Sequence, residues 1–346
     1  MSTANVINLY SDTQTRPCAA MREAMAGAEV GDEQRGEDPT VNRLCEQVAG
    51  LLGKPAALFL PSGTMCNEIA ILVHCRPGDE IYAHERAHII DFEAAGPAAF
   101  AGTHIRPLTG PLGTFSAQTL SEAIGPVSRY APQPRLVEIE QSTNMGGGAV
   151  WPLAQIRSVC EVARAHGLAV HMDGARLLNA VIASGVSARD HGACVDSIWI
   201  DLSKGLGCPV GAVLAGSHEF IEQAWRWKHR MGGAMRQAGI IAAAGIYALE
   251  HNVERLAEDH ANARRFAELI AGAARLTVTP NPVQTNILFI DLGAGGPDAR
   301  EVSAGLATQG VIIGAVDARR LRVVTHLDVN RAQVEQAARA LLSMLG

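Results

Sequence analysis

Ser197-Ile198-Trp199-Ile200-Asp201-Leu202-Ser203-Lys204-Gly205-Leu206-Gly207 is a short apolar run that leads into a glycine-rich segment with a lysine in it. Such a run, bounded by glycines, is typical of a buried β-strand followed by a loop. Upstream, a second run, Leu168-Ala169-Val170-His171-Met172-Asp173, ends in an aspartate followed by Gly174. We therefore expect a carboxylate and an amine at the ends of two successive strands.

Working outward from these two runs, short apolar stretches alternate with helix-like segments from about residue 56 to residue 215. Residues 153–165 are typical of the helices, with apolar side chains at helical spacing and a polar opposite face. This βαβ rhythm predicts an α/β fold with a mostly parallel, doubly wound sheet. Ligands of such sheets bind beyond the carboxyl ends of the strands, where Asp173 and Lys204 fall. The expected strands lie near residues 57–60, 80–83, 136–139, 170–172, 198–200 and 212–214.

The pattern changes after about residue 250. We expect a long amphipathic helix there, then strands near residues 286–291, 311–313 and 321–324 around a helix near residues 300–308. A last helix begins at Asn330 and Gln333, which have the spacing of a capping box. We therefore predict an N-terminal arm over residues 1–40, a large domain over 41–249, and a smaller α+β domain over 250–346.

Composition narrows the classes of function. The 346 residues are 48% hydrophobic, and the net charge of −6 is spread along the chain without a basic block. We therefore expect a small-molecule substrate and neither a nucleic-acid nor a membrane partner. The seven cysteines are scattered without a C-x-x-C pair, which favours reduced thiols in the cytoplasm and no metal site. Residues 1–5 do not resemble a secretory signal.

Lysine is rare in this chain, which makes Lys204 informative. Only three of the 29 basic residues are lysines. A guanidinium stays protonated, whereas a lysine amine can deprotonate and attack a carbonyl. An amine at one strand end and a carboxylate at the next suggest pyridoxal phosphate (PLP), with Asp173 on the pyridine nitrogen. Each residue also has an ordinary structural interpretation when it is considered alone. Lys204 could be an exposed lysine in a glycine-rich loop, and Asp173 could be a helix-capping aspartate.

Three further places carry candidate site residues. Ser62, Gly63 and Thr64 follow an expected strand and open a helix, which suits a phosphate, although an ordinary helix cap has the same sequence. His88 follows another strand and is either a ring-stacking or basic group or a structural histidine. Arg322 is either a carboxylate-binding residue or a surface ion-pair partner. A dinucleotide site at Gly205-Leu206-Gly207 is disfavoured by its spacing and by Pro209.

Taken together, several motifs resemble the low-specificity L-threonine aldolases, in the β-eliminating lyase group of the aspartate-aminotransferase-like (fold type I) PLP enzymes. The resemblance covers nearly the whole chain. The motifs that carry it are Leu9-Tyr10-Ser11-Asp12-Thr13, Val30-Gly31-Asp32-Glu33, Gly36-Glu37-Asp38-Pro39-Thr40, Phe59-Leu60-Pro61-Ser62-Gly63-Thr64-Met65, His171-Met172-Asp173-Gly174-Ala175-Arg176, Leu202-Ser203-Lys204-Gly205-Leu206, Gly232-Gly233-Ala234-Met235-Arg236-Gln237-Ala238-Gly239 and Leu321-Arg322-Val323-Val324-Thr325-His326.

The resemblance implies a role for each candidate. Lys204 binds the cofactor covalently, Asp173 holds the pyridine nitrogen, His88 stacks on the ring, and Ser62, Gly63 and Thr64 bind the phosphate. The implied carboxylate-binding set is Ser11, Arg176 and Arg322, and Arg176 also borders the cofactor. Arg236 is implied to reach the phosphate of a neighbouring subunit, because members of the family assemble as homo-oligomers, either dimers or tetramers.

Three positions depart from the family pattern: Tyr10 replaces a usual arginine, Arg35 a usual tyrosine, and Thr143 a histidine placed near the substrate hydroxyl. A threonine hydroxyl is short and is no base at neutral pH, so we expect Thr143 to contact substrate only weakly and to discriminate little at the β-carbon.

The activity that the resemblance implies is cleavage of L-threonine and L-allo-threonine to glycine and an aldehyde, in glycine biosynthesis and threonine catabolism. The alternative within the class is a related PLP lyase or aldolase that prefers bulkier substrates such as phenylserine. From another class, a non-catalytic or nucleotide-binding protein on the same scaffold stays open. The base that takes the hydroxyl proton is either His88 or an ordered water.

Overall fold

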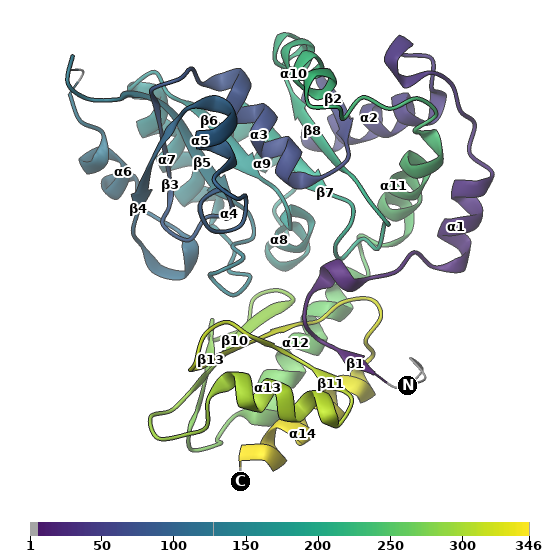
Figure 1. The fold of residues 1–346 in the computed structure, drawn as a ribbon, viewed down its shortest axis with the longest axis vertical. Helices are drawn as coiled ribbons and strands as arrows, with labels where there is room; N and C mark the ends of the chain where they lie inside the picture. Colours follow the sequence, from purple (N-terminus) through teal and green to yellow (C-terminus); the bar gives the residue numbers. More distant parts are fainter. Residues whose placement is uncertain (1–5, 127, 346) are drawn as a thin grey trace.

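The computed structural model describes residues 6–126 and 128–345. A larger body is built around a seven-stranded sheet, and a smaller body below it in Figure 1 is built around a four-stranded sheet. The earliest described residues and the last helix both lie in the smaller body.

The large sheet has the strand order β2-β8-β7-β6-β5-β3-β4. Strands β3 to β7 are parallel to one another, whereas β8 is antiparallel to both β7 and β2. The prediction of a mostly parallel sheet is therefore confirmed. The strands are β2 (Ala56–Leu60), β3 (Asp79–His84), β4 (His104–Leu108), β5 (Gln133–Glu140), β6 (Ala169–Asp173), β7 (Ser197–Asp201) and β8 (Ala212–Gly216).

Helices cover both faces of this sheet, because alternate side chains of each strand point to opposite faces. In β7, Ile198 and Ile200 belong to one apolar cluster, while Trp199 belongs to another on the opposite face. The Trp199 face carries α3 (Gly63–His74), α5 (Gly96–Ala101) and α10 (His218–Arg230). The other face carries α2 (Pro39–Leu52), α6 (Ala117–Ala123), α7 (Leu153–Ala165) and α9 (Ala188–Cys194), with α8 (Leu177–Ser184) and α11 (Gly239–His251) beside them.

Strand β4 was not expected from the sequence. It lies at the edge of the sheet and pairs only with β3. It reads His-Ile-Arg-Pro-Leu, with a proline at position 107 and partly exposed side chains. A proline is tolerated in a strand mainly at a sheet edge, and an edge strand needs no continuous apolar run.

The smaller body has the predicted helices and strands in the predicted order, but it also contains β9 and β12, which were not predicted. Its sheet is β12-β13-β10-β9, and all its pairs are antiparallel. Asn330 and Gln333 exchange backbone-to-side-chain hydrogen bonds of 2.9 and 3.0 Å, which confirms the capping box. The elements are α12 (Leu256–Ile270), β9 (Leu276–Thr279), β10 (Ile287–Leu292), α13 (Ala299–Thr308), β11 (Val311–Ile312), β12 (Gly314–Ala315), β13 (Arg320–Val324) and α14 (Arg331–Leu345).

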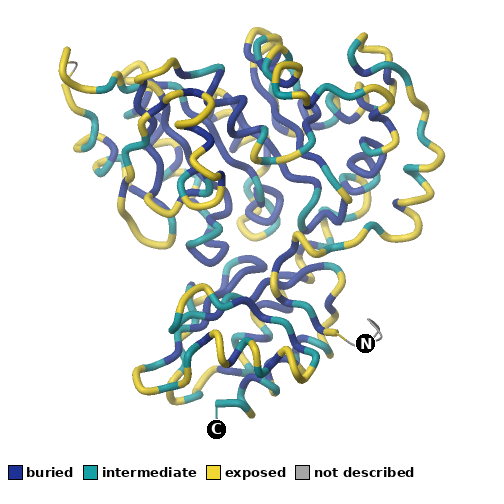
Figure 2. The backbone as a smooth tube through the Cα atoms, viewed as in Figure 1, coloured by how far each residue is buried: buried dark blue, intermediate teal, exposed yellow. Residues whose placement is uncertain are grey.

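The N-terminal segment joins the two bodies. Strand β1 (Ile7–Asn8) pairs in parallel with β11, and Ile7 and Leu9 lie in the apolar core of the smaller body. The chain then crosses to the larger body, where α1 (Ala19–Ala26) packs on α11. Most of the arm after this crossing is exposed, in contrast to the buried central strands (Figure 2). Three short 3-10 helices are Asp12–Gln14, Glu33–Arg35 and Pro111–Gly113.

Two buried carboxylates anchor the end of the arm. Asp38 caps α2 by accepting from the N–H groups of Thr40 and Val41, and it also accepts from the N–H of Gly239. Glu33 accepts from the buried amine of Lys228 on α10. The arm is therefore held by ion pairing as well as by contact.

Among the described residues, no helix is both long enough and apolar enough to span a membrane.

We predict that Lys228→Ala destabilises the fold strongly, because it leaves Glu33 buried without a cation. Removing one partner of a buried pair costs about 3–5 kcal/mol. Urea unfolding at neutral pH measures the loss. The matched control is Arg226→Ala, which removes an exposed cation from the same helix and is expected to change the free energy of unfolding by less than about 0.5 kcal/mol. Equal stabilities of the two variants would contradict the prediction.

Candidate active site

Polar side chains line the α3 face of three neighbouring strands near their carboxyl ends. They alternate with apolar residues that face the opposite side, such as Val137, Met172 and Ile200. A buried row of this kind costs desolvation energy, so its members need partners or must lose their charge. The row consists of Glu138 and Glu140 on β5, His171 and Asp173 on β6, and Trp199 and Asp201 on β7.

Trp199 lies at the centre of this row and fixes two close approaches. A Cβ added at Gly174 would lie 1.9 Å from the Trp199 carbonyl oxygen, so β6 and β7 meet there only because residue 174 is glycine. A Cβ at Gly63 would lie 2.2 Å from the indole ring. Gly63, predicted as a phosphate-binding residue, therefore also brings the start of α3 against β7.

Asn67 on α3 joins this row into one hydrogen-bond network. Its amide oxygen accepts from the indole nitrogen of Trp199 at 2.7 Å. Its amide nitrogen donates to Asp173 Oδ2 at 2.8 Å and to Glu93 Oε1 at 2.7 Å. Asp173 also accepts from the backbone N–H of Ala175 at 2.9 Å and is almost completely buried. The aspartate is thus held rigidly at the carboxyl end of β6.

His88 begins the short helix α4 (His88–Asp91) and lies beside these acids. Its Nδ1 is 2.7 Å from Glu93 Oε1, and its backbone N–H donates to Glu140 Oε2 at 2.9 Å. Burial alone would lower the pKa of His88, but the Glu93 hydrogen bond and the charge of Asp173 outweigh burial and raise it. Potential ligand atoms of His88, Glu93 and Asp173 lie within 4.8 Å of one another, although hydrogen bonds already engage all three residues.

The surrounding carboxyls are a mixture of charged and neutral groups. Burial, and then the charge of Asp173, raise the pKa of Glu140 to about 7. The pKa of Glu138 lies well above its ordinary value, chiefly because of burial. Burial and the charge of Glu93 raise the pKa of Glu68 to about 8. The raised pKa values of these three glutamates favour their neutral forms, which limits the negative charge around Asp173.

Lys204 lies in the loop after β7, as predicted. Its Nζ is 3.1 Å from Asp201 Oδ2 and 5.8 Å from the centre of the Trp199 ring. The Thr15 hydroxyl donates to the Lys204 carbonyl at 2.8 Å, so the N-terminal arm helps to fix the loop. The amine thus lies near the same indole that contacts Gly63.

The other two lysines are engaged elsewhere. Lys54 donates to the Val195 carbonyl, and Lys228 donates to Glu33 and to the Phe59 carbonyl. Lys204 is therefore the lysine that lies at this end of β6 and β7.

The start of α3 is open to an anion. The Ser62 side chain caps the helix by accepting from the Met65 N–H at 3.2 Å, and both Ser62 and Thr64 are exposed. The first N–H groups of a helix have no partner within the helix, and they carry the positive end of its dipole. The predicted phosphate-binding residues thus form an N-terminus that can receive a negative group.

One predicted carboxylate-binding residue, Arg176, belongs to a buried ion pair, and another, Ser11, lies next to the partner of that pair. Arg176 donates to both oxygens of Asp12, at 2.7 Å each. Burial would raise the pKa of Asp12, but Arg176 holds it well below its ordinary range. Ser11 caps the short helix at Asp12 by accepting from the Thr13 N–H at 3.2 Å. The roles of Arg176 and Ser11 toward a substrate stay predictions.

Arg322 approaches from β13 in the smaller body. It donates to the Tyr10 carbonyl at 3.3 Å and to Asn144 Oδ1 at 2.7 Å. Its Nε is buried without a hydrogen-bond partner among the described residues. Burial, and then the charge of Arg176, lower the pKa of Arg322 to about 10. A guanidinium with neutral partners and an unused N–H can still receive an anion.

Two further predicted site residues have opposite surroundings: Thr143 is buried, and Arg236 is exposed. Thr143 is almost completely buried, and its hydroxyl donates to the Leu112 carbonyl at 2.9 Å. A Cβ added at Gly113 would lie 2.7 Å from the Thr143 Cβ. The neighbouring Asn144 is the residue of this loop that contacts Arg322. The side chain of Arg236 is 62% exposed and pairs with Asp32 at 2.8 Å. The predicted contacts of Thr143 and Arg236 with substrate and cofactor stay predictions.

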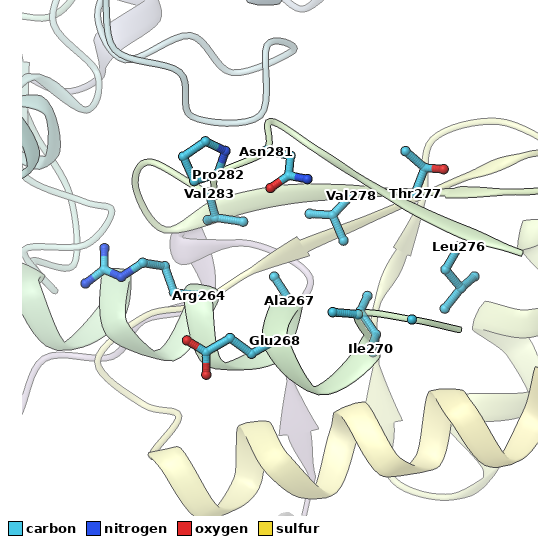
Figure 3. A pocket seen from close by; sticks show the side chains of 12 residues that line it. Arg264, Ala267, Glu268, Ile270, Leu276, Thr277, Val278, Asn281, Pro282 and Val283 are labelled. Atoms are coloured by element: carbon cyan, nitrogen blue, oxygen red, sulfur yellow. The ribbon is translucent and has the colours of Figure 1, made fainter. Parts of the chain in front are cut away.

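A cleft of about 410 Å³ lies between the two bodies beside Arg322. It combines polar groups with the exposed rings of Tyr10 and Phe92 and with Met145 and Val316. A separate groove of about 430 Å³ lies between α12 and β9 (Figure 3). Arg264 and Glu268 are its charged lining residues, and it contains none of the predicted site residues. The cleft, and not the groove, adjoins the polar row.

Sequence reasoning missed Asn67, Glu93 and the role of Trp199. One signal was present: Asn67 and Glu68 interrupt the otherwise apolar segment Cys66 to Leu72. A polar pair in a buried helix face requires partners. Nothing comparable marked Glu93, whose role depends on the course of the chain after β3.

Comparisons with known proteins identify the family of this chain. The model of the β-eliminating lyase family matches residues 8–293. A low-specificity L-threonine aldolase from Escherichia coli (strain K12) is 41% identical over 96% of this chain and 97% of its own length. Low-specificity L-threonine aldolase 1 from Arabidopsis thaliana is 38% identical over 95% of this chain and 93% of its own length.

Solved structures share the fold. A threonine aldolase from Leishmania major aligns with a TM-score of 0.84 at 19% identity, covering 98% of this chain and 100% of that one. A serine palmitoyltransferase from Sphingomonas wittichii aligns with a TM-score of 0.75 at 18% identity, covering 98% and 86%. The fold is therefore that of the fold type I PLP enzymes, as expected. With these sequence matches, the chain belongs to the β-eliminating lyase family and, within it, to the low-specificity L-threonine aldolases.

Proposed function

We propose that this chain is a PLP-dependent aldolase that cleaves L-threonine and L-allo-threonine to glycine and acetaldehyde. The observation that carries the proposal is the convergence, around Trp199, of a rigidly held Asp173, the amine of Lys204 and the open start of α3. The names of relatives 38–41% identical over almost the whole chain support the same activity.

The residues present fit pyridoxal phosphate. Asp173 is a buried acceptor that would hold the pyridine nitrogen, and Lys204 would hold the cofactor covalently. Ser62, Gly63 and Thr64 would receive the phosphate at the start of α3. When bound, pyridoxal phosphate supplies an electron-withdrawing ring that stabilises negative charge at the substrate Cα.

The chain's own residues provide the remaining requirements of the cleavage. The Cα–Cβ bond breaks as the β-hydroxyl loses its proton, which leaves an aldehyde, and Cα then takes up a proton to give glycine. The negative charge of Asp173 favours the protonated form of a nitrogen held against it. Arg322 would bind the substrate carboxylate through its unused N–H. His88, whose side chain is partly exposed beside Asp173, would serve as the base for the hydroxyl proton.

The second candidate is preference for bulkier β-substituents, such as the phenyl group of phenylserine. The cleft beside Arg322 favours it, because the side chains of Tyr10, Phe92, Met145 and Val316 offer apolar surface next to the proposed carboxylate site. Such a surface would bind a larger apolar group more tightly than a methyl group. Rates for phenylserine and threonine distinguish the two candidates directly.

The assembly and the setting of the enzyme are proposals as well. The exposed surface of α1 and the exposed Val30 and Ile240 support a homo-oligomer, either a dimer or a homotetramer, in which Arg236 reaches a neighbouring site. All seven cysteines are free, which supports a reducing compartment, the cytoplasm. The reaction would serve glycine biosynthesis and threonine catabolism.

Lys204→Ala is expected to abolish turnover and the visible absorption band of covalently held cofactor, while the protein stays folded. The reason is that no other lysine lies at this site. Absorption spectra after addition of pyridoxal phosphate, with borohydride reduction, measure the attachment. Lys54→Ala is the matched control and is expected to keep the band. Loss of the band in Lys54→Ala alone would contradict the assignment of Lys204.

Arg322→Ala is expected to raise the KM for L-threonine more than it lowers kcat, because the carboxylate contact is present before and during the reaction. Loss of a buried charged hydrogen bond costs about 2 kcal/mol or more, roughly 30-fold in KM. Steady-state kinetics measure both constants. Arg320→Ala, which removes the neighbouring arginine that pairs with Asp291, is the control and should change KM less than about two-fold. An unchanged KM in Arg322→Ala would exclude this role.

The wild-type enzyme is expected to discriminate weakly between L-threonine and L-allo-threonine, because the Thr143 hydroxyl is bonded to Leu112 and offers no base. The ratio of kcat/KM for the two substrates measures the discrimination. Thr143→Val removes the hydroxyl at nearly constant size and should change this ratio less than about three-fold, roughly 0.6 kcal/mol. A ten-fold change would show that the hydroxyl reaches the substrate.

A further inference from the structure

The orientation of the Asn67 amide is fixed by its neighbours. The Trp199 indole nitrogen can only donate, and it lies 2.7 Å from Asn67 Oδ1. The same oxygen lies 3.2 Å from His171 Nε2. Because Oδ1 faces these groups, Nδ2 must face the acids, where it donates to Glu93 Oε1 and Asp173 Oδ2. One amide therefore positions the two carboxylates relative to each other.

Glu93 lies beside a second buried carboxyl, Glu68. Burial and the charge of Glu93 raise the pKa of Glu68 to about 8, so Glu68 holds a proton at neutral pH. The Glu93 side chain is fully buried and has no room to exchange its partners with water. Because the amide nitrogen of Asn67 can only donate, Glu93 Oε1 is the acceptor in their 2.7 Å hydrogen bond.

This arrangement decides which nitrogen of His88 carries the proton. Nδ1 lies 2.7 Å from Glu93 Oε1, so it must donate. We infer that Glu93 is a positioning residue: it holds the proton of His88 on Nδ1, orients the ring, and leaves Nε2 free to accept a proton from the substrate. The His88 side chain is 29% exposed, in contrast to the buried Glu93, so part of the ring remains open to the site.

This inference rests on the proposed function for its catalytic meaning but not for its geometry. A histidine acts as a base only when it is neutral, so activity is lost as pH falls through its pKa. Glu93 and Asp173 raise the pKa of His88, while burial and Lys204 lower it, and Glu140 accepts from its backbone. Glu93, Asp173, Glu140 and Lys204 are therefore the ionisable groups that act on His88 from the surrounding helices, strands and loops. Removal of the Glu93 charge should therefore lower the pKa of His88.

The first test is the protonation of His88 in the full-length protein as purified. Solid-state NMR of protein labelled with ¹⁵N-histidine distinguishes the two neutral tautomers, and His88→Gln identifies the signal. We expect a proton on Nδ1 and none on Nε2 above the pKa of His88. A neutral ring with its proton on Nε2 overturns the inference, and this outcome needs no Glu93 variant to fold and no activity.

The second test compares Glu93→Gln with Glu85→Gln, which removes an exposed negative charge three residues before His88. In Glu93→Gln we expect the NMR pKa of His88 and the acidic limb of kcat/KM for L-threonine to move down together by roughly one pH unit. We expect kcat to fall roughly ten-fold or more. Glu93→Asp, which restores the charge, should bring the limb back toward the wild-type position.

The outcomes separate the inference from the proposed function. A His88 pKa in Glu93→Gln equal to that in Glu85→Gln overturns the role of Glu93, whatever the activity. A wild-type protein that has the expected tautomer but does not cleave β-hydroxy amino acids overturns the proposed function, and the contact between Glu93 and His88 still stands.

Discussion

The close contact of Trp199 with two glycines is the constraint on which the rest of the site depends. Its carbonyl leaves no room for a side chain at Gly174, and its ring leaves none at Gly63. Asp173 precedes one of these glycines, and the open start of α3 contains the other. Lys204 follows Trp199 in the loop after β7. A single buried aromatic residue thus sets the separations among the three groups that would hold the cofactor.

The site also concentrates acids that a folded protein usually keeps apart. Glu68, Glu93, Glu138, Glu140 and Asp173 are buried close together, and their burial is unfavourable without partners. Hydrogen bonds from Asn67 and His88 stabilise Glu93, Asp173 and Glu140. Raised pKa values favour the neutral forms of Glu68 and Glu138. Local instability of this kind is expected where a site is built for chemistry and not for stability.

Local sequence patterns predicted most of the strands and helices. They did not predict which side chains from different strands and helices come into contact. Apolar runs located six of the seven strands of the large sheet, because a buried parallel strand must be apolar along most of its length. The exception, β4, is an edge strand with a proline. Lys204 could be identified because lysine is rare in this chain. The partners of Asn67, Asp173 and Trp199, are more than 100 residues away in the sequence, so its polar position could be noticed but its contacts could not be predicted. Glu93 lies only five residues from His88, but no periodic pattern in the sequence brings the two side chains together. Thr143 was expected to face a substrate, whereas its burial depends on the loops around Gly113 and Gly146.

The pairing of β1 with β11 has a mechanical consequence. The first described residues lie in the smaller body, and the chain crosses to the larger body after residue 10 and returns through α12. Two covalent connections therefore join the bodies, whereas a single one would act as a swivel. Rotation is then confined largely to the line that joins the two crossings. A movement that separated Arg322 from Asn144, which are in contact here, would therefore have to follow a rotation about this line. The contact of Thr15 with the Lys204 loop lies near the first of the two crossings.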